Sequence, residues 1–116
     1  MSKATTDDAT TSAAQPGALA GLKVLECATV LAGPTLGMML ADFGADVVKV
    51  EHPRKGDPLR GTGYQKDGVG LWWKMANRNK RCITLNLSSD KGGSLFREMA
   101  ADVDVVIENF RTGTME

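Results

Sequence analysis

The chain has 116 residues, of which 42% are hydrophobic and 24% charged, which is typical of a globular protein and excludes a disordered or fibrous one. Its 14 basic and 14 acidic side chains cancel, so the overall charge gives no reason to expect binding to nucleic acid or to an acidic membrane. The length allows one small domain, or part of a larger one, with a modest hydrophobic core.

Residues 1–18 are predicted to be a disordered tail, because they are polar and follow no hydrophobic period. They lack the apolar stretch of a signal peptide, and Asp7 and Asp8 stand where a transit peptide would be basic. The longest apolar run, residues 28–41, is too short to span a bilayer and is interrupted by a Gly-Pro pair. We therefore expect a cytoplasmic protein without a membrane partner.

The two cysteines, Cys27 and Cys82, are far apart in the sequence and belong to no Cys-x-x-Cys or Cys/His spacing. Neither a disulfide framework nor a zinc site is indicated, and we expect no metal. Both cysteines occupy positions typical of buried strand residues, which agrees with a reducing cytoplasm.

The first elements follow a strand, helix, strand order. Residues 22–27 are a short apolar run after a glycine and predict a buried strand, and residues 45–51 predict a second one. Between them, residues 34–44 predict an amphipathic helix that begins near Pro34 and ends before Gly44. Its apolar face is expected to be formed by Leu36, Met39, Leu40 and Phe43. The two strands should be parallel, with a right-handed crossover.

The second half repeats this order after a long gap. Residues 52–70 are rich in Gly and Pro without periodicity and predict a long, functional loop, while residues 71–77 add a helical turn. Residues 82–87 alternate as a strand, and residues 104–110 predict a fourth strand that ends in a polar turn. A helix between them is expected to start at one of three candidate N-caps, Ser88, Ser89 or Asp90. Its apolar stripe is Leu95, Phe96, Met99 and Val103.

This order predicts an α/β fold, with an open, mostly parallel, Rossmann-like sheet flanked by helices. Such sheets bind ligands beyond the carboxyl ends of their strands. In this chain those ends are residues 28–34, 51–60, 87–90 and 109–113.

Several short motifs do not support a specific chemistry. The Gly-Thr-Gly at residues 61–63 neither follows a strand nor opens a helix, so it is not a dinucleotide fingerprint, and Glu51 then has no ribose to bind. His52 is the only histidine and has no evident catalytic partner. The sequence contains no Ser/His/Asp arrangement, metal cluster or P-loop.

Positive charge gathers in the middle third of the chain, where residues 49–81 hold nine basic and three acidic side chains. Such a run is either a solvated loop or a site for a polyanionic ligand, and composition alone leaves both open.

Four segments in order resemble the N-terminal part of the class III coenzyme A (CoA) transferases. They are LAGLKVLECATVLAGP (residues 19–34), LADFGADVVKVEHPRKGDPLRG (40–61), NRNKRCITLNL (77–87) and DVVIENFRTG (104–113). The family includes formyl-CoA transferase, carnitine CoA-transferase and α-methylacyl-CoA racemase. The resemblance covers residues 19–116 and implies that they are the N-terminal segment of the large domain of this family's fold.

The resemblance also implies a set of site residues. Val30 and Leu31 are expected near the pantetheine and the thioester, and His52 stands where formyl-CoA transferases place a phosphate-binding arginine. The other implied contacts are Leu85, Asn86, Leu87 and Ser88 beside the adenosine, and Asn109, Phe110 and Arg111 beside the pantetheine. The apolar residues of this set could equally be core residues, whereas an amide at a strand end, as at Asn109, needs hydrogen-bond partners.

The positive charges fit a ligand with a 3′-phosphate and a diphosphate. Arg78, Lys80 and Arg81 are expected to border the nucleotide, or alternatively to pair with the acidic residues of segment 82–116. The resemblance does not extend to two positions: His52 replaces the arginine, and Thr112 stands where the family usually has proline.

The family implies transfer of CoA from an acyl-CoA to a carboxylic acid, through a mixed anhydride and an aspartyl-CoA thioester. The aspartate lies downstream of the last residue, Glu116, and members are several times longer, so we assign no catalytic residue and expect a truncated chain that is inactive alone. Full-length members form interlocked homodimers. Two alternatives stay open: a racemase-type isomerase, which Asn109 weakly disfavours, and a CoA-binding module without catalysis.

Overall fold

The computed structural model describes residues 16–115, so most of the predicted disordered tail lies outside the described residues. Its elements in chain order are β1 (Lys23–Glu26), α1 (Ala32–Asp42), β2 (Asp46–Glu51), η1 (Pro58–Gly61), β3 (Gln65–Lys66), β4 (Val69–Gly70), α2 (Leu71–Ala76), β5 (Arg81–Thr84), α3 (Asp90–Ala101) and β6 (Val105–Ile107). Within residues 16–115, no helix has both the length and the apolar composition needed to cross a membrane.

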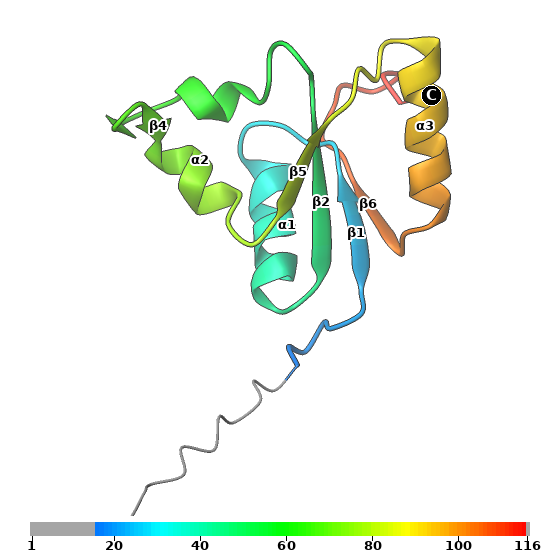
Figure 1. Cartoon of the computed structure of the whole chain (residues 1–116), viewed down its shortest axis with the longest axis horizontal. Coiled ribbons are helices and arrows are strands. Elements are labelled where there is room, and N and C mark those ends of the chain that lie inside the picture. Colours follow the sequence, from blue (N-terminus) through cyan, green and yellow to red (C-terminus); the bar gives the residue numbers. More distant parts are fainter. Residues whose placement is uncertain (1–15, 116) are drawn as a thin grey trace, which may run out of the picture.

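Four parallel strands form the central sheet in the order β5-β2-β1-β6, which confirms the predicted α/β class (Figure 1). In register, Val24 of β1 pairs with Val47 of β2 on one side and with Val105 of β6 on the other. From β1 the chain moves to β2 on one side, and it later returns to β6 on the opposite side. The strand order therefore reverses between β1 and β6, and doubly wound sheets bind ligands outside the carboxyl ends at such a reversal.

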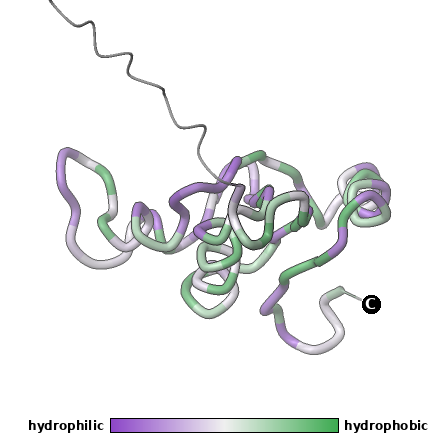
Figure 2. Tube along the Cα trace, turned by 90° about the horizontal axis from the view of Figure 1, so that it is seen from below, coloured by the Kyte–Doolittle hydropathy of each residue, from purple (hydrophilic) through white to green (hydrophobic). Residues whose placement is uncertain are grey.

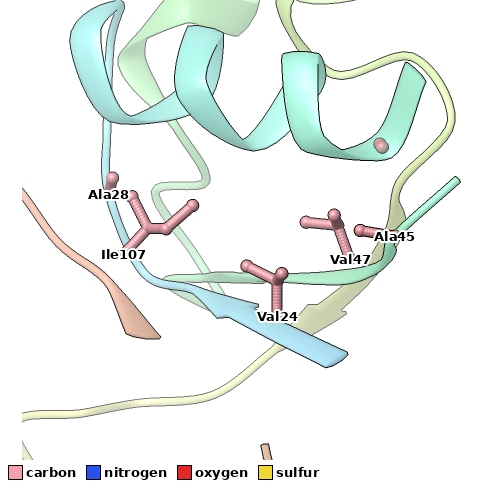
Figure 3. Packing of buried hydrophobic residues seen from close by; sticks show 6 residues of the cluster. Val24, Ala28, Ala45, Val47 and Ile107 are labelled. Atoms are coloured by element: carbon pink, nitrogen blue, oxygen red, sulfur yellow. The ribbon is translucent and has the colours of Figure 1, made fainter. Parts of the chain in front are cut away.

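Helices cover both faces of this sheet, with α1 on one face and α3 on the other (Figure 1). The cluster beneath α1 includes Val24, Ala28, Val47 and Ile107, whose side chains point toward the helix in Figure 3. The cluster on the α3 face consists of Leu25, Cys27, Val50 and Phe96. Neighbouring residues of β1 thus alternate between the two cores, as the two-residue period of a strand requires.

The face of α1 that packs on the sheet is not the predicted one. Leu36, Met39 and Phe43 are 48%, 51% and 58% exposed, and the buried residues of the helix are Gly33, Pro34, Gly37 and Ala41. A Cβ on Gly33 would overlap the Cβ of Ala28, and one on Gly37 would overlap the carboxylate of Glu26. The helix lies so close to the sheet that only small residues fit at the contact. The prediction was therefore wrong for Leu36, Met39 and Phe43, whereas Leu40 does pack against the cluster.

Other boundaries also differ from the predictions. Residues 52–70 are not a structureless loop, because they contain η1 and the antiparallel β3–β4 pair, which projects beside α2. Strand β5 ends at Thr84, and all four of its residues are exposed because it lies at the edge of the sheet. Cys82 is therefore exposed, contrary to expectation, whereas Cys27 is buried. The helix α3 starts as expected, with the Ser89 hydroxyl accepting a hydrogen bond from the Gly92 amide.

Candidate functional site

A pocket of about 500 Å³ opens at the carboxyl ends of the strands, on the face covered by α3. Its walls come from the ends of β1 and β2, the segment after β5, one side of α3 and the residues that follow β6. In Figure 2 the hydrophobic β6 gives way to hydrophilic residues where the strand ends, before the chain turns back toward its C-terminus. The volume lies within the range of small-molecule sites.

Five of the ten residues that the sequence pointed to line this pocket: His52, Leu85, Leu87, Ser88 and Phe110. Three of them, Leu85, Leu87 and Phe110, also pack against the core cluster on the α3 face, so they are core residues that line the pocket as well. The pocket floor is accordingly apolar. Their contact with a ligand stays a prediction.

The other five lie near the pocket without lining it. Val30 and Leu31 occupy the turn between β1 and α1 and are each 43% exposed. The Asn86 side chain accepts a hydrogen bond from the Ser88 amide and its carbonyl accepts one from the Ser89 hydroxyl, which shapes the entry to α3. Arg111 is exposed after β6.

Asn109 joins the two strands between which the strand order reverses. Its Oδ1 accepts a hydrogen bond of 2.8 Å from the Thr29 amide, and its Nδ2 donates one of 2.8 Å to the Thr29 carbonyl. The amide therefore holds the backbone after β1 in a fixed position relative to β6. This meets the expectation that an amide at a strand end needs partners.

His52 is held by the loop that follows it. Its Nδ1 accepts hydrogen bonds from the amides of Arg54 (3.1 Å) and Lys55 (3.2 Å). The ring proton of the neutral imidazole is therefore on Nε2, which is free to donate to a ligand. Arg54 and Lys55 themselves make no ion pair with a residue of segment 16–115.

Arg97 and Cys27 are among the pocket residues that sequence reasoning did not assign to the site. Arg97 of α3 lines the pocket and makes no ion pair with any described residue. It lies about two turns after the start of α3, a position that could not be read from an apolar stripe. Cys27 also lines the pocket, and burial, with the nearby charge of Glu108 as a lesser cause, raises the pKa of its thiol to about 11. At neutral pH this thiol is protonated and is a poor nucleophile.

A buried ion network lies beside the pocket, and sequence reasoning did not find it. The Nζ of Lys49 is 2.9 Å from both a Glu26 and an Asp57 carboxylate oxygen, and it donates to the Ala28 carbonyl at 2.9 Å. Lys80 pairs with the other oxygen of Glu26 at 2.7 Å and donates to the Pro34 carbonyl. The side chains of Lys49, Lys80 and Glu26 are fully buried. Burial lowers the pKa of Lys80, and its bond with Glu26 offsets only part of that effect.

A third carboxylate, that of Glu51, extends this network. Glu51 accepts two hydrogen bonds of 2.8 Å from the Arg60 guanidinium and one of 3.0 Å from the Asp57 amide. Burial alone would raise the pKa of Glu51, but these hydrogen bonds outweigh it, so the pKa lies below its ordinary value. Arg60 also stacks on the Trp73 ring at 3.6 Å. The sequence did contain a signal for this network, because charged residues in strands that are covered on both faces need charged or hydrogen-bonding partners.

Asp57 connects this network to the turn after β1. Its Oδ1 accepts hydrogen bonds from the Leu59 amide (2.9 Å), as the N-cap of η1, and from the Val30 amide (3.1 Å). An Asp before a Pro is a helix-start signal that could have identified η1 from the sequence.

The expected pairing of Arg78, Lys80 and Arg81 with acidic residues of segment 82–116 was wrong, and none of the three lines the pocket. Arg78 pairs with Asp42 at the end of α1, and Arg81 pairs with Asp46 at the start of β2, so both lie at the amino edge, away from the pocket. Lys80 is buried against Glu26. None of the three pairs with an acidic residue of segment 82–116, because the chain turn before β5 directs them toward α1, β1 and β2.

Comparison with known proteins identifies the class. The family described as CoA-transferase family III matches residues 19–116, and the chain belongs to this family. A succinyl-CoA–D-citramalate CoA-transferase of Chloroflexus aurantiacus is 48% identical over 102 residues, which are 87% of this chain and 25% of that protein. A succinate–glutarate CoA-transferase of Agrobacterium fabrum is 46% identical over 100 residues, which are 80% and 25% of the two chains.

A solved structure agrees with this membership. The crystal structure of a CAIB/BAIF family protein from Brucella suis matches with a TM-score of 0.77 and 44% identity, over 85% of this chain and 27% of that one. The chain thus spans about a quarter of the length of the relatives that it matches.

Proposed function

We propose that these residues form part of the CoA site of an enzyme that moves CoA from an acyl-CoA donor to a carboxylic acid acceptor. The names of the two relatives describe transfer between succinyl-CoA or succinate and a second dicarboxylic acid, which favours a transferase over a racemase. By family resemblance, the chemistry passes through an aspartyl-CoA thioester on an aspartate outside the matched region. The part described here binds and orients CoA.

The pocket at the carboxyl edge is the observation that carries this proposal. Its apolar floor, with Leu85, Leu87 and Phe110, suits the adenine ring and the pantetheine chain. His52 offers an Nε2–H donor, and Arg97 offers a guanidinium without a protein counter-ion among residues 16–115. Phosphate oxygens are the ligand groups that such donors bind best.

The proposal is tested by measuring the affinity of the 116-residue chain for CoA with isothermal titration calorimetry. Replacement His52→Asn keeps an acceptor for the loop amides but removes the Nε2 donor. We expect it to weaken CoA binding about two- to tenfold, the effect of one hydrogen bond.

Binding of two fragments of CoA shows which part of the ligand His52 contacts. Adenosine 3′,5′-bisphosphate should lose affinity in the His52→Asn chain as CoA does, whereas pantetheine should not. Arg78→Ala is the control, because it removes a hydrogen-bond donor side chain at the amino edge, away from the pocket. No CoA binding by the wild-type chain, or an equal loss in the Arg78→Ala chain, would contradict the proposal.

A CoA-binding module without catalysis makes the same binding prediction. An activity assay distinguishes the transferase from the binding module. The protein is taken as it occurs in its source cells and is supplied with succinyl-CoA and a dicarboxylic acid. Formation of a new acyl-CoA supports the transferase, and binding without turnover supports the module.

A further inference from the structure

Val30 has an unusual backbone conformation at the point where the chain leaves β1. Its φ is +65°, a region that β-branched residues rarely adopt. The residue is 43% exposed, so core packing does not explain why the conformation persists. A glycine would adopt it without strain, and the chain has valine here. Strained residues persist where the surrounding structure holds them, and they gather at functional sites.

Three consecutive residues of this turn are held by side chains from other elements. The Ala28 carbonyl accepts from Lys49 of β2 at 2.9 Å, and the Thr29 amide and carbonyl are both bound by Asn109 after β6. The Val30 amide donates to Asp57 of the loop before η1 at 3.1 Å. The backbone of the turn is thus fixed at each residue, while the side chains of Val30 and Leu31 stay exposed.

Asp57 can hold the turn because it is itself fixed on every side. It is 2% exposed, its Oδ2 pairs with Lys49 at 2.9 Å, and its Oδ1 also accepts from the Leu59 amide. Its own amide donates to Glu51 at 3.0 Å. Lys49 and Asp57 are therefore a coupled pair that holds Ala28 and Val30, the residues on either side of Thr29.

We propose that Asp57 is a positioning residue, whose carboxylate keeps the turn after β1 in the conformation that places Thr29 in the pocket wall and Val30 and Leu31 beside it. This inference rests on the proposed function, because it takes the ligand to be the acyl-CoA bound at the carboxyl edge. The Val30 amide that Asp57 binds belongs to an exposed turn at the point where the strand order reverses.

Two replacements of Val30 form a matched pair. They test whether the conformation of the turn matters for binding, without replacing any residue of the buried ion network. Val30→Gly and Val30→Pro both remove the isopropyl group, but only glycine adopts a positive φ and retains an amide N–H for Asp57. We expect the Val30→Pro chain to bind CoA about tenfold more weakly than the Val30→Gly chain, measured by calorimetry well below both unfolding temperatures. Equal affinities would overturn the positioning role.

Asp57→Ala tests the contact itself through the φ of Val30, measured from NMR couplings of the labelled chain. We expect Val30 to leave the positive region, and a φ that stays positive would overturn the inference. This measurement needs no ligand. If the wild-type chain fails to bind CoA while Val30 moves in the Asp57→Ala chain, the proposed function is contradicted and the role of Asp57 in the turn is supported.

Discussion

Ion pairs lie at both edges of the sheet, but in very different surroundings. At the carboxyl edge, Lys49 and Glu26 are 0% exposed and are part of a connected network. At the amino edge, the side chains of Arg81 and Asp46 are 68% and 53% exposed, and their pair is isolated. Buried charges are costly unless every partner is present, whereas exposed pairs contribute little. The same residue types therefore organise the candidate site at one edge and have little influence at the other.

Removal of the central cation should have the largest effect. Lys49→Met leaves the carboxylates of Glu26 and Asp57 buried without their shared partner. We expect the free energy of unfolding to fall by about 3–5 kcal/mol in urea denaturation. Lys74→Met on α2 is the control, since Lys74 makes no ion pair with a described residue, and it should change stability by less than about 0.5 kcal/mol. Similar losses of stability in both variants would contradict the proposed difference between buried and exposed charges.

The close approach of α1 to this network gives the next largest effect. Gly37→Ala places a methyl group on the Glu26 carboxylate and near the Lys80 ammonium. Overpacking of this kind should destabilise the fold by about 1–3 kcal/mol, despite the better helix propensity of alanine. Gly61→Ala is the matched control, because nothing lies within 4 Å of its added methyl group. A gain in stability for Gly37→Ala in thermal unfolding would show that the helix does not pack as described.

Glu51 provides a test that depends on pH. Its folded-state pKa lies below the ordinary value of 4.5, so its contribution to stability is fully present above pH 4.5 and is lost as the pH falls through the folded pKa. The wild type should therefore be more stable than Glu51→Gln at neutral pH, and the difference should shrink below pH 4.5. Unfolding temperatures measured across this range check the sign. A difference that grows on acidification would be the contrary result.

The smallest effect is expected at the amino edge. Arg81→Ala removes an exposed, isolated pair with Asp46 and should lower the free energy of unfolding by less than about 1 kcal/mol. The loss should fall further in high salt, because solvent-exposed charges are screened. A loss as large as that of Lys49→Met would remove the distinction between the two edges.

The order of elements was predictable because it depends on local patterns. Short apolar runs marked the four strands, Gly44 adopts the positive φ expected after α1, and Ser89 caps α3. The packing face of α1 was not predictable, because large apolar residues suggest burial, whereas this face needs small ones at Gly33 and Gly37. That requirement comes from the proximity of the sheet, which no local period reveals.

The candidate site was predictable only in its location. The carboxyl ends of the strands were named from the fold class, and His52 and Ser88 do line the pocket there. The role of the cations was not predictable, because Lys80 and Arg81 are adjacent in sequence yet reach Glu26 in the interior and Asp46 at the surface. A cluster of charged residues in the sequence therefore does not predict which of their side chains lie on the same surface of the folded protein.

The most direct test of the central claim is an NMR titration of the labelled 116-residue chain with CoA. If the carboxyl edge is the binding site, the amide signals of His52, Ser88 and Phe110 should shift on addition of CoA. Those of Arg78 and Arg81 at the amino edge should stay in place. Shifts confined to the amino edge, or no shifts at saturating CoA, would contradict the account.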